Sequence, residues 1–276
     1  MFGEGQNAMP ETKDKQKRSR DSVANTLTVS IVLSLVASVL VATAAISLKP
    51  IQERNEEQFR QKIILDVAGL YSPDADINEL FRGIETRMVD LASGEYTDAA
   101  DAGEFDAIAA AKDPLTGINI PPADDIANIK QRARVAPVYL VLDGEEVTQV
   151  ILPIYGSGLW STMFGFMSLD PDGTTIRGLR FYEHAETPGL GDQIDKSDWR
   201  AQWVGKKVFA DDDQPRVEVV RGFVDQNSVD AEYQVDGLSG ATLTGRGVTK
   251  LVQYWTGPHG FGPYLAKLRS EESADD

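Results

Sequence analysis

An uncharged stretch of 27 residues, from Ser22 to Leu48, constrains this chain more than any other feature. As an α-helix it would measure about 40 Å, at about 1.5 Å per residue, which is enough to cross a bilayer with some tilt. A cleavable signal peptide is the alternative, because Ala42-Thr43-Ala44 resembles a cleavage site behind a basic segment. Secretory apolar cores run only about 7–15 residues, so the length favours an uncleaved anchor. We predict a tail over residues 1–21 and a transmembrane helix over residues 22–48.

Basic residues on both sides of this stretch bear on its orientation. Five precede it and four follow it closely: Lys13, Lys15, Lys17, Arg18 and Arg20, then Lys49, Arg54, Arg60 and Lys62. The first cluster is denser and lies directly beside the apolar stretch, which favours a cytoplasmic N-terminus and an exported C-terminal part. Residues 51–276 carry 21 basic and 39 acidic residues, a net charge of −18, so the exported part is the acidic one.

The composition excludes several kinds of chemistry. The chain contains no cysteine, which rules out disulfides, thiolate catalysis, cysteine-bound iron–sulfur clusters and cysteine-based zinc sites within it. Its two histidines, His184 and His259, are too few for a histidine metal cage, and we expect no metal site. A formal net charge of −16 argues against a nucleic-acid-binding protein, which needs clustered Lys and Arg side chains.

Residues 49–136 are predicted to form a helical lead-in followed by connecting structure. Apolar residues recur at helical spacing from Ile51 to Leu70, and again from Ile77 to Leu91 before Ser93-Gly94. The stretch from Asp98 to Pro122 is rich in Ala, Asp, Gly and Pro, which predicts connecting structure.

From residue 137 onward the pattern changes to strands and short helices. We predict two hairpins, 138–142 with 147–154 and 164–169 with 175–182, then a short helix over 199–204, a strand over 217–224 and a helix around 248–255. The fold class is therefore α+β: one N-terminal transmembrane helix, followed by an antiparallel-sheet domain over residues 137–276 with flanking helices.

Three glycine-rich segments stand out in this domain. They are Gly158-Leu159-Trp160-Ser161, then Glu183-His184-Ala185-Glu186-Thr187-Pro188-Gly189-Leu190-Gly191, and finally Asp236-Gly237-Leu238-Ser239-Gly240-Ala241-Thr242-Leu243-Thr244 directly before a helix. Small residues around a hydroxyl at a helix start suit a phosphate group. A plain helix N-cap is the alternative interpretation for the third segment, and ordinary turns for the other two.

In this order, the three segments resemble the FMN-binding domain family, and most closely its members that form the C subunit of the sodium-translocating NADH:quinone reductases. The similarity also includes the membrane helix with Lys49-Pro50-Ile51-Gln52 and the run from Trp255 to Leu265, so it covers nearly the whole chain. The resemblance implies that Thr242 carries FMN through a phosphoester bond made by a separate flavin transferase, with Thr244 as the competing hydroxyl.

The resemblance also implies the remaining binding residues. Asp236 would belong to the transferase recognition sequence, and Ser239, Gly240 and Ala241 would pack by the phosphate. Glu186 and Thr187 would lie near the isoalloxazine ring, with apolar contact from Leu159, Trp160 and Leu190. No catalytic acid, base or nucleophile for a substrate is implied.

By the same resemblance, the chain is part of a bacterial inner-membrane enzyme, with a periplasmic flavin domain that relays electrons between the other subunits. Two alternatives stay open. One is the equivalent flavin subunit of the related ferredoxin:NAD-oxidoreductase complex. The other is a non-redox, membrane-anchored binding or assembly module in which Ser-Gly-Ala-Thr only caps a helix.

Overall fold

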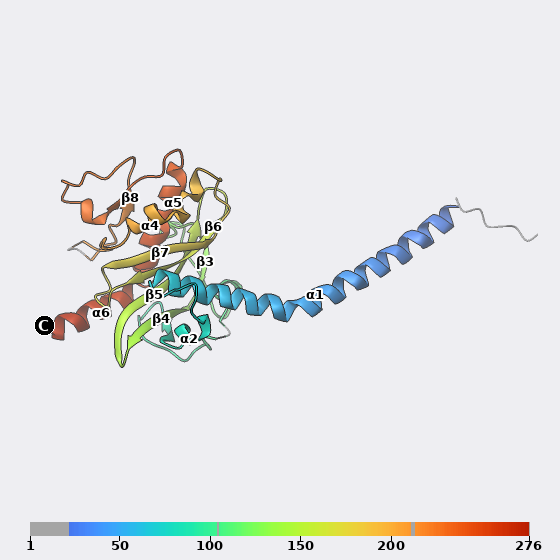
Figure 1. The fold of residues 1–276 in the computed structure, drawn as a ribbon, viewed down its shortest axis with the longest axis horizontal. Helices are drawn as coiled ribbons and strands as arrows, with labels where there is room; N and C mark the ends of the chain where they lie inside the picture. Colours follow the sequence, from blue (N-terminus) through green and yellow to red (C-terminus); the bar gives the residue numbers. More distant parts are fainter. Residues whose placement is uncertain (1–21, 104, 211–212, 276) are drawn as a thin grey trace, which may run out of the picture. The chain divides into compact units, whose positions relative to one another are not determined.

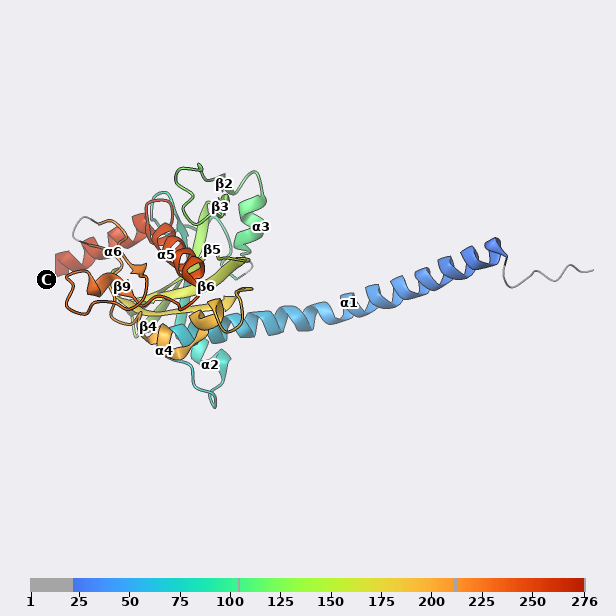
Figure 2. The same cartoon turned by 90° about the horizontal axis from the view of Figure 1, so that it is seen from above.

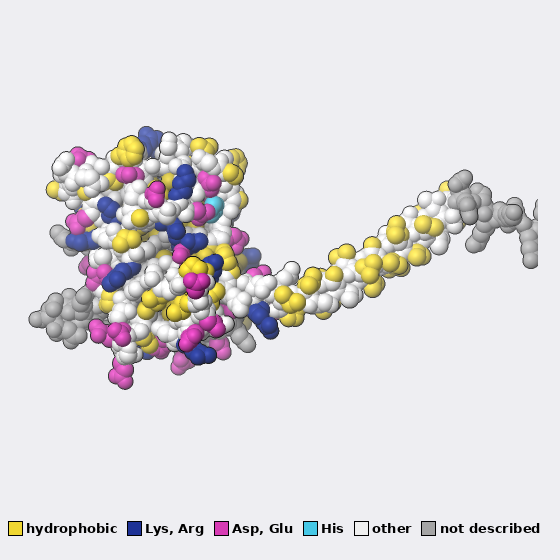
Figure 3. Space-filling model, in the orientation of Figure 1, with side chains coloured by type: hydrophobic (Ala, Val, Ile, Leu, Met, Phe, Trp, Pro, Cys, Tyr) yellow, Lys and Arg dark blue, Asp and Glu magenta, His cyan; other side chains and the backbone are white. Residues whose placement is uncertain are grey.

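The computed structural model describes residues 22–103, 105–210 and 213–275, and it begins with one long helix. Helix α1 (Val23–Val67) joins the predicted membrane span to the first helix of the predicted lead-in, through Pro50 (Figure 1). Its apolar part reaches a mean hydropathy of 2.5, and in the described residues it is the one helix long and apolar enough to cross a membrane. Figure 3 shows exposed apolar side chains along this part. The boundary between two compact units falls between Glu56 and Glu57.

The second unit is built on a five-stranded antiparallel sheet. Its strands are β1 (Ile84–Asp90), β4 (Val135–Asp143), β5 (Glu146–Ser157), β6 (Thr162–Leu169) and β7 (Ile176–Glu183), in the spatial order β1-β4-β5-β6-β7. Both predicted hairpins are confirmed, since β4 pairs with β5 and β6 pairs with β7. The α+β class of the domain is confirmed as well.

The prediction of one helix from Ile77 to Leu91 is wrong. Only α2 (Ile77–Phe81) is helical, and the chain then enters the edge strand β1, in which Ile84 pairs with Val141 and Asp90 with Val135. The three- and four-residue spacing of apolar side chains is compatible with a helix, but pairing with the buried strand β4 decides the outcome. The sheet therefore includes a strand from within the lead-in region of residues 49–136.

The sheet separates two hydrophobic cores, because alternate side chains of each strand point to opposite faces. Val138 and Leu140 face the larger core, which also holds Val248 and Leu251 of helix α5 (Thr242–Thr256). Neighbouring side chains, including Tyr139, face a smaller core with Ile63, Ile64 and Leu65 from the end of α1. Figure 2 shows α5 and α6 (Gly262–Asp275) on one side of the sheet and the end of α1 with α2 on the other.

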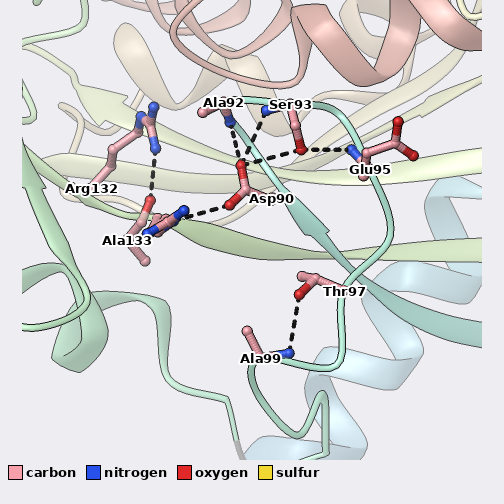
Figure 4. A network of polar contacts seen from close by, with 9 residues as sticks. Asp90, Ala92, Ser93, Glu95, Thr97, Ala99, Arg132 and Ala133 are labelled. Atoms are coloured by element: carbon pink, nitrogen blue, oxygen red, sulfur yellow. Dashed lines mark hydrogen bonds and ion pairs between the residues drawn. The ribbon is translucent and has the colours of Figure 1, made fainter.

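A carboxylate closes the turn that follows β1 (Figure 4). Asp90 accepts hydrogen bonds from the backbone N–H groups of Ala92 (3.0 Å) and Ser93 (3.1 Å), and from the Arg134 Nε atom (3.0 Å). Burial raises the pKa of Asp90, but the hydrogen bonds from Arg134 and the turn outweigh it, so the net pKa lies below its ordinary value. This charged turn fixes the end of the edge strand.

Short elements complete the unit. They are α3 (Ala107–Lys112), β2 (Gly117–Asn119), β3 (Gln131–Ala133), η1 (Gly191–Asp195), α4 (Ser197–Ala201), β8 (Glu218–Val219), η2 (Ala231–Tyr233) and β9 (Gln234–Val235). The predicted helix near Trp199 is present as α4 but starts and ends earlier, and the predicted strand over 217–224 shrinks to the two residues of β8. The predicted connecting structure between Asp98 and Pro122 contains α3 and β2.

Candidate functional site

The three glycine-rich segments come together in the fold. The first follows β5, the second follows β7, and the third leads into α5. Helix α5 approaches the first segment closely, because a Cβ atom at Gly247 would lie 2.8 Å from the Ser157 carbonyl oxygen and 3.3 Å from the Gly158 Cα atom. The sheet and one helix thus bring the segments into one region.

A single buried carboxylate joins all three segments. Glu186, which is 4% exposed, accepts hydrogen bonds at Oε1 from the backbone N–H groups of Leu159 (2.8 Å) and Trp160 (3.2 Å). At Oε2 it accepts the hydroxyl hydrogen of Thr244. A buried charge of this kind is tolerated where several donors satisfy it. Glu186 therefore holds the loops in place from within the protein.

Two glycines make room for this carboxylate. A Cβ atom at Gly158 would collide with Glu186 Oε1, and one at Gly191 would lie 2.9 Å from Glu186 Oε2 and 2.8 Å from Thr244 Oγ1. Both distances are shorter than side-chain carbons tolerate, so the hydrogen-bonded cluster requires glycine on both sides.

The outer surface of these loops carries exposed apolar side chains. Their exposed fractions are 42% for Leu159, 68% for Trp160, 43% for Leu190 and 55% for Leu243. The indole N–H group of Trp160 donates to Thr187 Oγ1 at 2.9 Å, which fixes the ring on the second segment. Leu190 lies against Gly240, where an added Cβ atom would be 2.9 Å from Leu190 Cδ2. Large exposed apolar side chains gathered near one point are typical of a ligand site.

The two threonines of the third segment have opposite environments. Thr242, the first residue of α5, is exposed, whereas Thr244 is fully buried and its hydroxyl is bonded to Glu186. The N-cap position belongs to Ala241, with no side-chain capping hydrogen bond. The hydroxyl of Thr242 is thus free of the capping role that a threonine at a helix start often has.

The residues before Thr242 are anchored by backbone contacts. The Ser239 carbonyl oxygen accepts from Gln193 Nε2 at 3.3 Å, Gly240 adopts a left-handed φ of +73°, and Ala241 is buried. The Oδ1 atom of Asp236 accepts from the Val224 N–H group at 2.8 Å. Asp236 therefore shapes a neighbouring loop.

Thr242 also lines a groove of about 690 Å³ that runs beside α5. The other wall comes from β8 and residues 220–222. Sequence reasoning missed this groove and also missed Leu243. Arg246 and Lys250 lie four and eight residues beyond Thr242, a helical spacing that could have drawn attention to them.

Comparisons with known proteins match the part of the chain that contains the three segments. Residues 158–257 match the FMN-binding domain family. The chain is 46% identical to the C subunit of the Na(+)-translocating NADH-quinone reductase of Haemophilus ducreyi, over 94% of its own length and 99% of that protein. It is 45% identical to the corresponding protein of Vibrio alginolyticus over 92% and 98% of the two chains. The crystal structure of Shewanella oneidensis NqrC is 33% identical, with a TM-score of 0.72 over 80% of this chain and 99% of that one.

Proposed function

Because this chain belongs to the NqrC family, the C subunits of the Na(+)-translocating NADH-quinone reductases, we propose that it carries FMN covalently on Thr242 and relays electrons within that complex. The observation that carries the proposal is the contrast between the two threonines. The hydroxyl of Thr242 faces solvent at the start of α5, and the hydroxyl of Thr244 is buried against Glu186.

The residues around Thr242 fit a flavin nucleotide. Leu159, Trp160 and Leu190, with the additional Leu243, offer apolar surface for a planar ring, and Thr187 orients the indole of Trp160. Glu186 contributes from beneath by fixing the backbone of Leu159 and Trp160. When bound, FMN supplies the electron transfer, and the protein supplies its position and surroundings. Ser239, Gly240 and Ala241 form the turn that presents the Thr242 hydroxyl.

The attachment proceeds with Thr242 as the nucleophile and a separate flavin transferase as the catalyst. The Thr242 Oγ1 atom forms a bond to the phosphorus of a flavin nucleotide that carries a leaving group there. The bond between phosphorus and the leaving group breaks, and a base on the transferase accepts the hydroxyl proton. An exposed hydroxyl is required because a second protein must reach it.

The apolar part of α1 anchors the chain in the inner membrane, with the N-terminus in the cytoplasm and the flavin domain in the periplasm. Support comes from the length and hydropathy of the helix and from the basic residues before it. A covalent tether keeps the cofactor on a domain outside the cytoplasm. The electron donor and acceptor are other subunits of the complex.

Co-expression of the full chain with a flavin transferase tests the proposal. After denaturing gel electrophoresis, the wild-type band should fluoresce as a flavin, and Thr242→Ala should abolish the signal. Thr244→Ser keeps a hydroxyl that can donate to Glu186, so it is the matched control and should remain fluorescent.

Other outcomes would contradict parts of the proposal. Fluorescence that persists in Thr242→Ala would place the attachment elsewhere, and Ser239→Ala would then be the next variant because Ser239 is also exposed. A wild-type band without fluorescence, beside an active transferase, would refute the covalent flavin and leave the Ser-Gly-Ala-Thr turn without a cofactor role.

A further inference from the structure

We propose that the groove beside Thr242 is a phosphate-binding subsite whose ligands are Arg221, Arg246 and Lys250. This inference rests on the proposed function in one respect, since it takes the phosphorylated ligand to be a flavin nucleotide. It adds a second set of binding residues to the Ser-Gly-Ala-Thr turn. The groove, its basic side chains and its position next to the Thr242 hydroxyl carry the argument.

Helix α5 forms one wall of the groove. Thr242, Arg246 and Lys250 all line it, and their spacing of four residues places them along one face of the helix. A group joined to the Thr242 hydroxyl would therefore lie next to Arg246, with Lys250 one helical turn further along. Gly245 and Thr249 also line the groove, and their small side chains leave space beside the two cations.

The opposite wall carries Arg221, and the fold holds that wall against the Ser-Gly-Ala-Thr segment. The Val220 N–H group donates to the Val235 carbonyl oxygen at 2.9 Å, and the Gly237 N–H group donates to the Gly222 carbonyl oxygen at 2.7 Å. These two hydrogen bonds flank Arg221 on either side. Both walls are thus tied to the segment that presents Thr242.

The charges in the groove are unbalanced. Within the residues that the structure describes, Arg221, Arg246 and Lys250 form no ion pair and no side-chain hydrogen bond. The one acidic residue that lines the groove, Glu218, accepts from Gln234 Nε2 at 3.0 Å. The side chains that line the groove therefore carry three positive charges and one negative charge, an excess that favours an anion as the ligand.

The chemistry of these cations favours phosphate. Two guanidinium groups offer forked donors that match phosphate oxygens, and the lysine adds a mobile point charge. This arrangement is unusual in a chain whose net charge is −16. The groove, at about 690 Å³, is much larger than one phosphate group. It can receive either the phosphate of FMN itself or a second phosphate that leaves when Thr242 is modified.

The test uses the full chain, purified in detergent from cells without a flavin transferase. FMN and riboflavin differ only by the phosphate, so the ratio of their dissociation constants, measured by flavin fluorescence, isolates the phosphate contribution. The groove variant combines Arg221→Gln, Arg246→Gln and Lys250→Gln. The matched control combines Arg82→Gln, Lys112→Gln and Lys196→Gln, three exposed cations away from the groove and without ion pairs among the described residues.

We expect the wild-type and control chains to bind FMN about tenfold more tightly than riboflavin, equivalent to about 1.4 kcal/mol. If the groove takes the phosphate of FMN, the groove variant should lose most of this preference. A groove variant that keeps the wild-type ratio, or a wild-type ratio near one, would show that the groove does not take the phosphate of FMN. The proposal would be overturned if, in addition, the wild-type chain bound inorganic pyrophosphate no more tightly than the groove variant does. Thermal unfolding of each variant verifies that it is folded. Because free flavins are used, a chain that cannot be modified covalently still gives a valid result here.

Inorganic pyrophosphate then separates the two sources of phosphate. If the groove takes the phosphate of FMN, pyrophosphate should displace FMN from the wild-type chain competitively. If it takes a second phosphate, pyrophosphate should bind without displacing FMN. In either case the groove variant should bind pyrophosphate at least about tenfold more weakly, and undiminished binding would count against the three cations.

Discussion

Removing the carboxylate of Glu186 should loosen the whole site, because this side chain connects three segments that are far apart in sequence. Glu186→Ala leaves the N–H group of Leu159 and the hydroxyl of Thr244 without their acceptor. The backbone N–H group of Trp160 also loses its acceptor at 3.2 Å. Trp160 is 68% exposed, so this loss should cost less than the loss at the buried Thr244. The substitution therefore removes hydrogen bonds from a buried part of the protein, where Glu186 is 4% and Thr244 0% exposed.

The expected cost follows from the number of donors. A buried donor without a partner costs about 1–3 kcal/mol. The alanine variant no longer has the desolvation penalty of a buried carboxylate, which offsets part of the total, so we expect about 3 kcal/mol of lost unfolding free energy. For a domain of this size, that corresponds to a fall in Tm of about 6–12 °C. Glu186→Gln keeps the shape and one acceptor oxygen, and should cost about 1 kcal/mol.

Circular dichroism melting of the flavin-free full chain measures the stability, and tryptophan fluorescence reports on the exposed indole of Trp160. Glu218→Ala is the matched control, since Glu218 is a half-buried carboxylate with one side-chain partner, and it should stay within about 0.5 kcal/mol of wild type. A Glu186→Ala chain that melts within about 2 °C of wild type would refute the reasoning, because the loops would then be held by other contacts.

Three further predictions follow from the same contacts. Thr242→Ala in the flavin-free chain should change the unfolding free energy by less than about 0.5 kcal/mol in a denaturant titration, whereas a capping threonine would cost about 1 kcal/mol. Gly158→Ala should lower the unfolding free energy by about 1–3 kcal/mol, because the added Cβ atom collides with Glu186. Gly83→Ala is the control, since its added Cβ atom meets only the Leu80 carbonyl oxygen at 3.5 Å, and it should not destabilise the chain. Equal melting curves for the two variants would disprove this prediction. Burial raises the pKa of Tyr182 from 10.0 to about 12, so its contribution to stability is complete below pH 10 and declines by about 1.4 kcal/mol per pH unit up to about pH 12. Absorbance at 295 nm should show delayed ionisation of the buried tyrosines, among them Tyr139, Tyr155 and Tyr254, and Tyr182→Phe should reduce the delayed change by the amplitude of one tyrosine.

The elements that the sequence predicted well are those with strong local signals. The two hairpins combine alternating side chains with turn residues, as at Asp143-Gly144, and helix α5 has clear apolar spacing. Strand β1 was missed because its apolar residues also fit helical spacing, and the partner that makes it a strand lies about 50 residues away in β4. Its assignment depends on a contact that no local pattern contains.

The same distinction applies to the site. Motif order identified the three loops, but the role of Glu186 as their common acceptor depends on how β5, β7 and α5 meet. Arg246 could have been recognised from its distance to Thr242 along the helix. Arg221 could not, because its wall depends on β8 and β9, a parallel pair of only two residues each.

Helix geometry gives a reason why only one of two nearby threonines is exposed. Successive residues of an α-helix are about 100° apart around its axis, so two residues separate Thr242 and Thr244 by about 200°. When one faces the protein interior, the other must face solvent. Glu186 fixes this rotation by holding Thr244 inside, and it thereby turns Thr242 outward. In the proposed attachment, a transferase would have no need to distinguish the two hydroxyls chemically. If FMN is attached as proposed, the buried carboxylate contributes to the choice of Thr242 through the fold and not through contact with the cofactor.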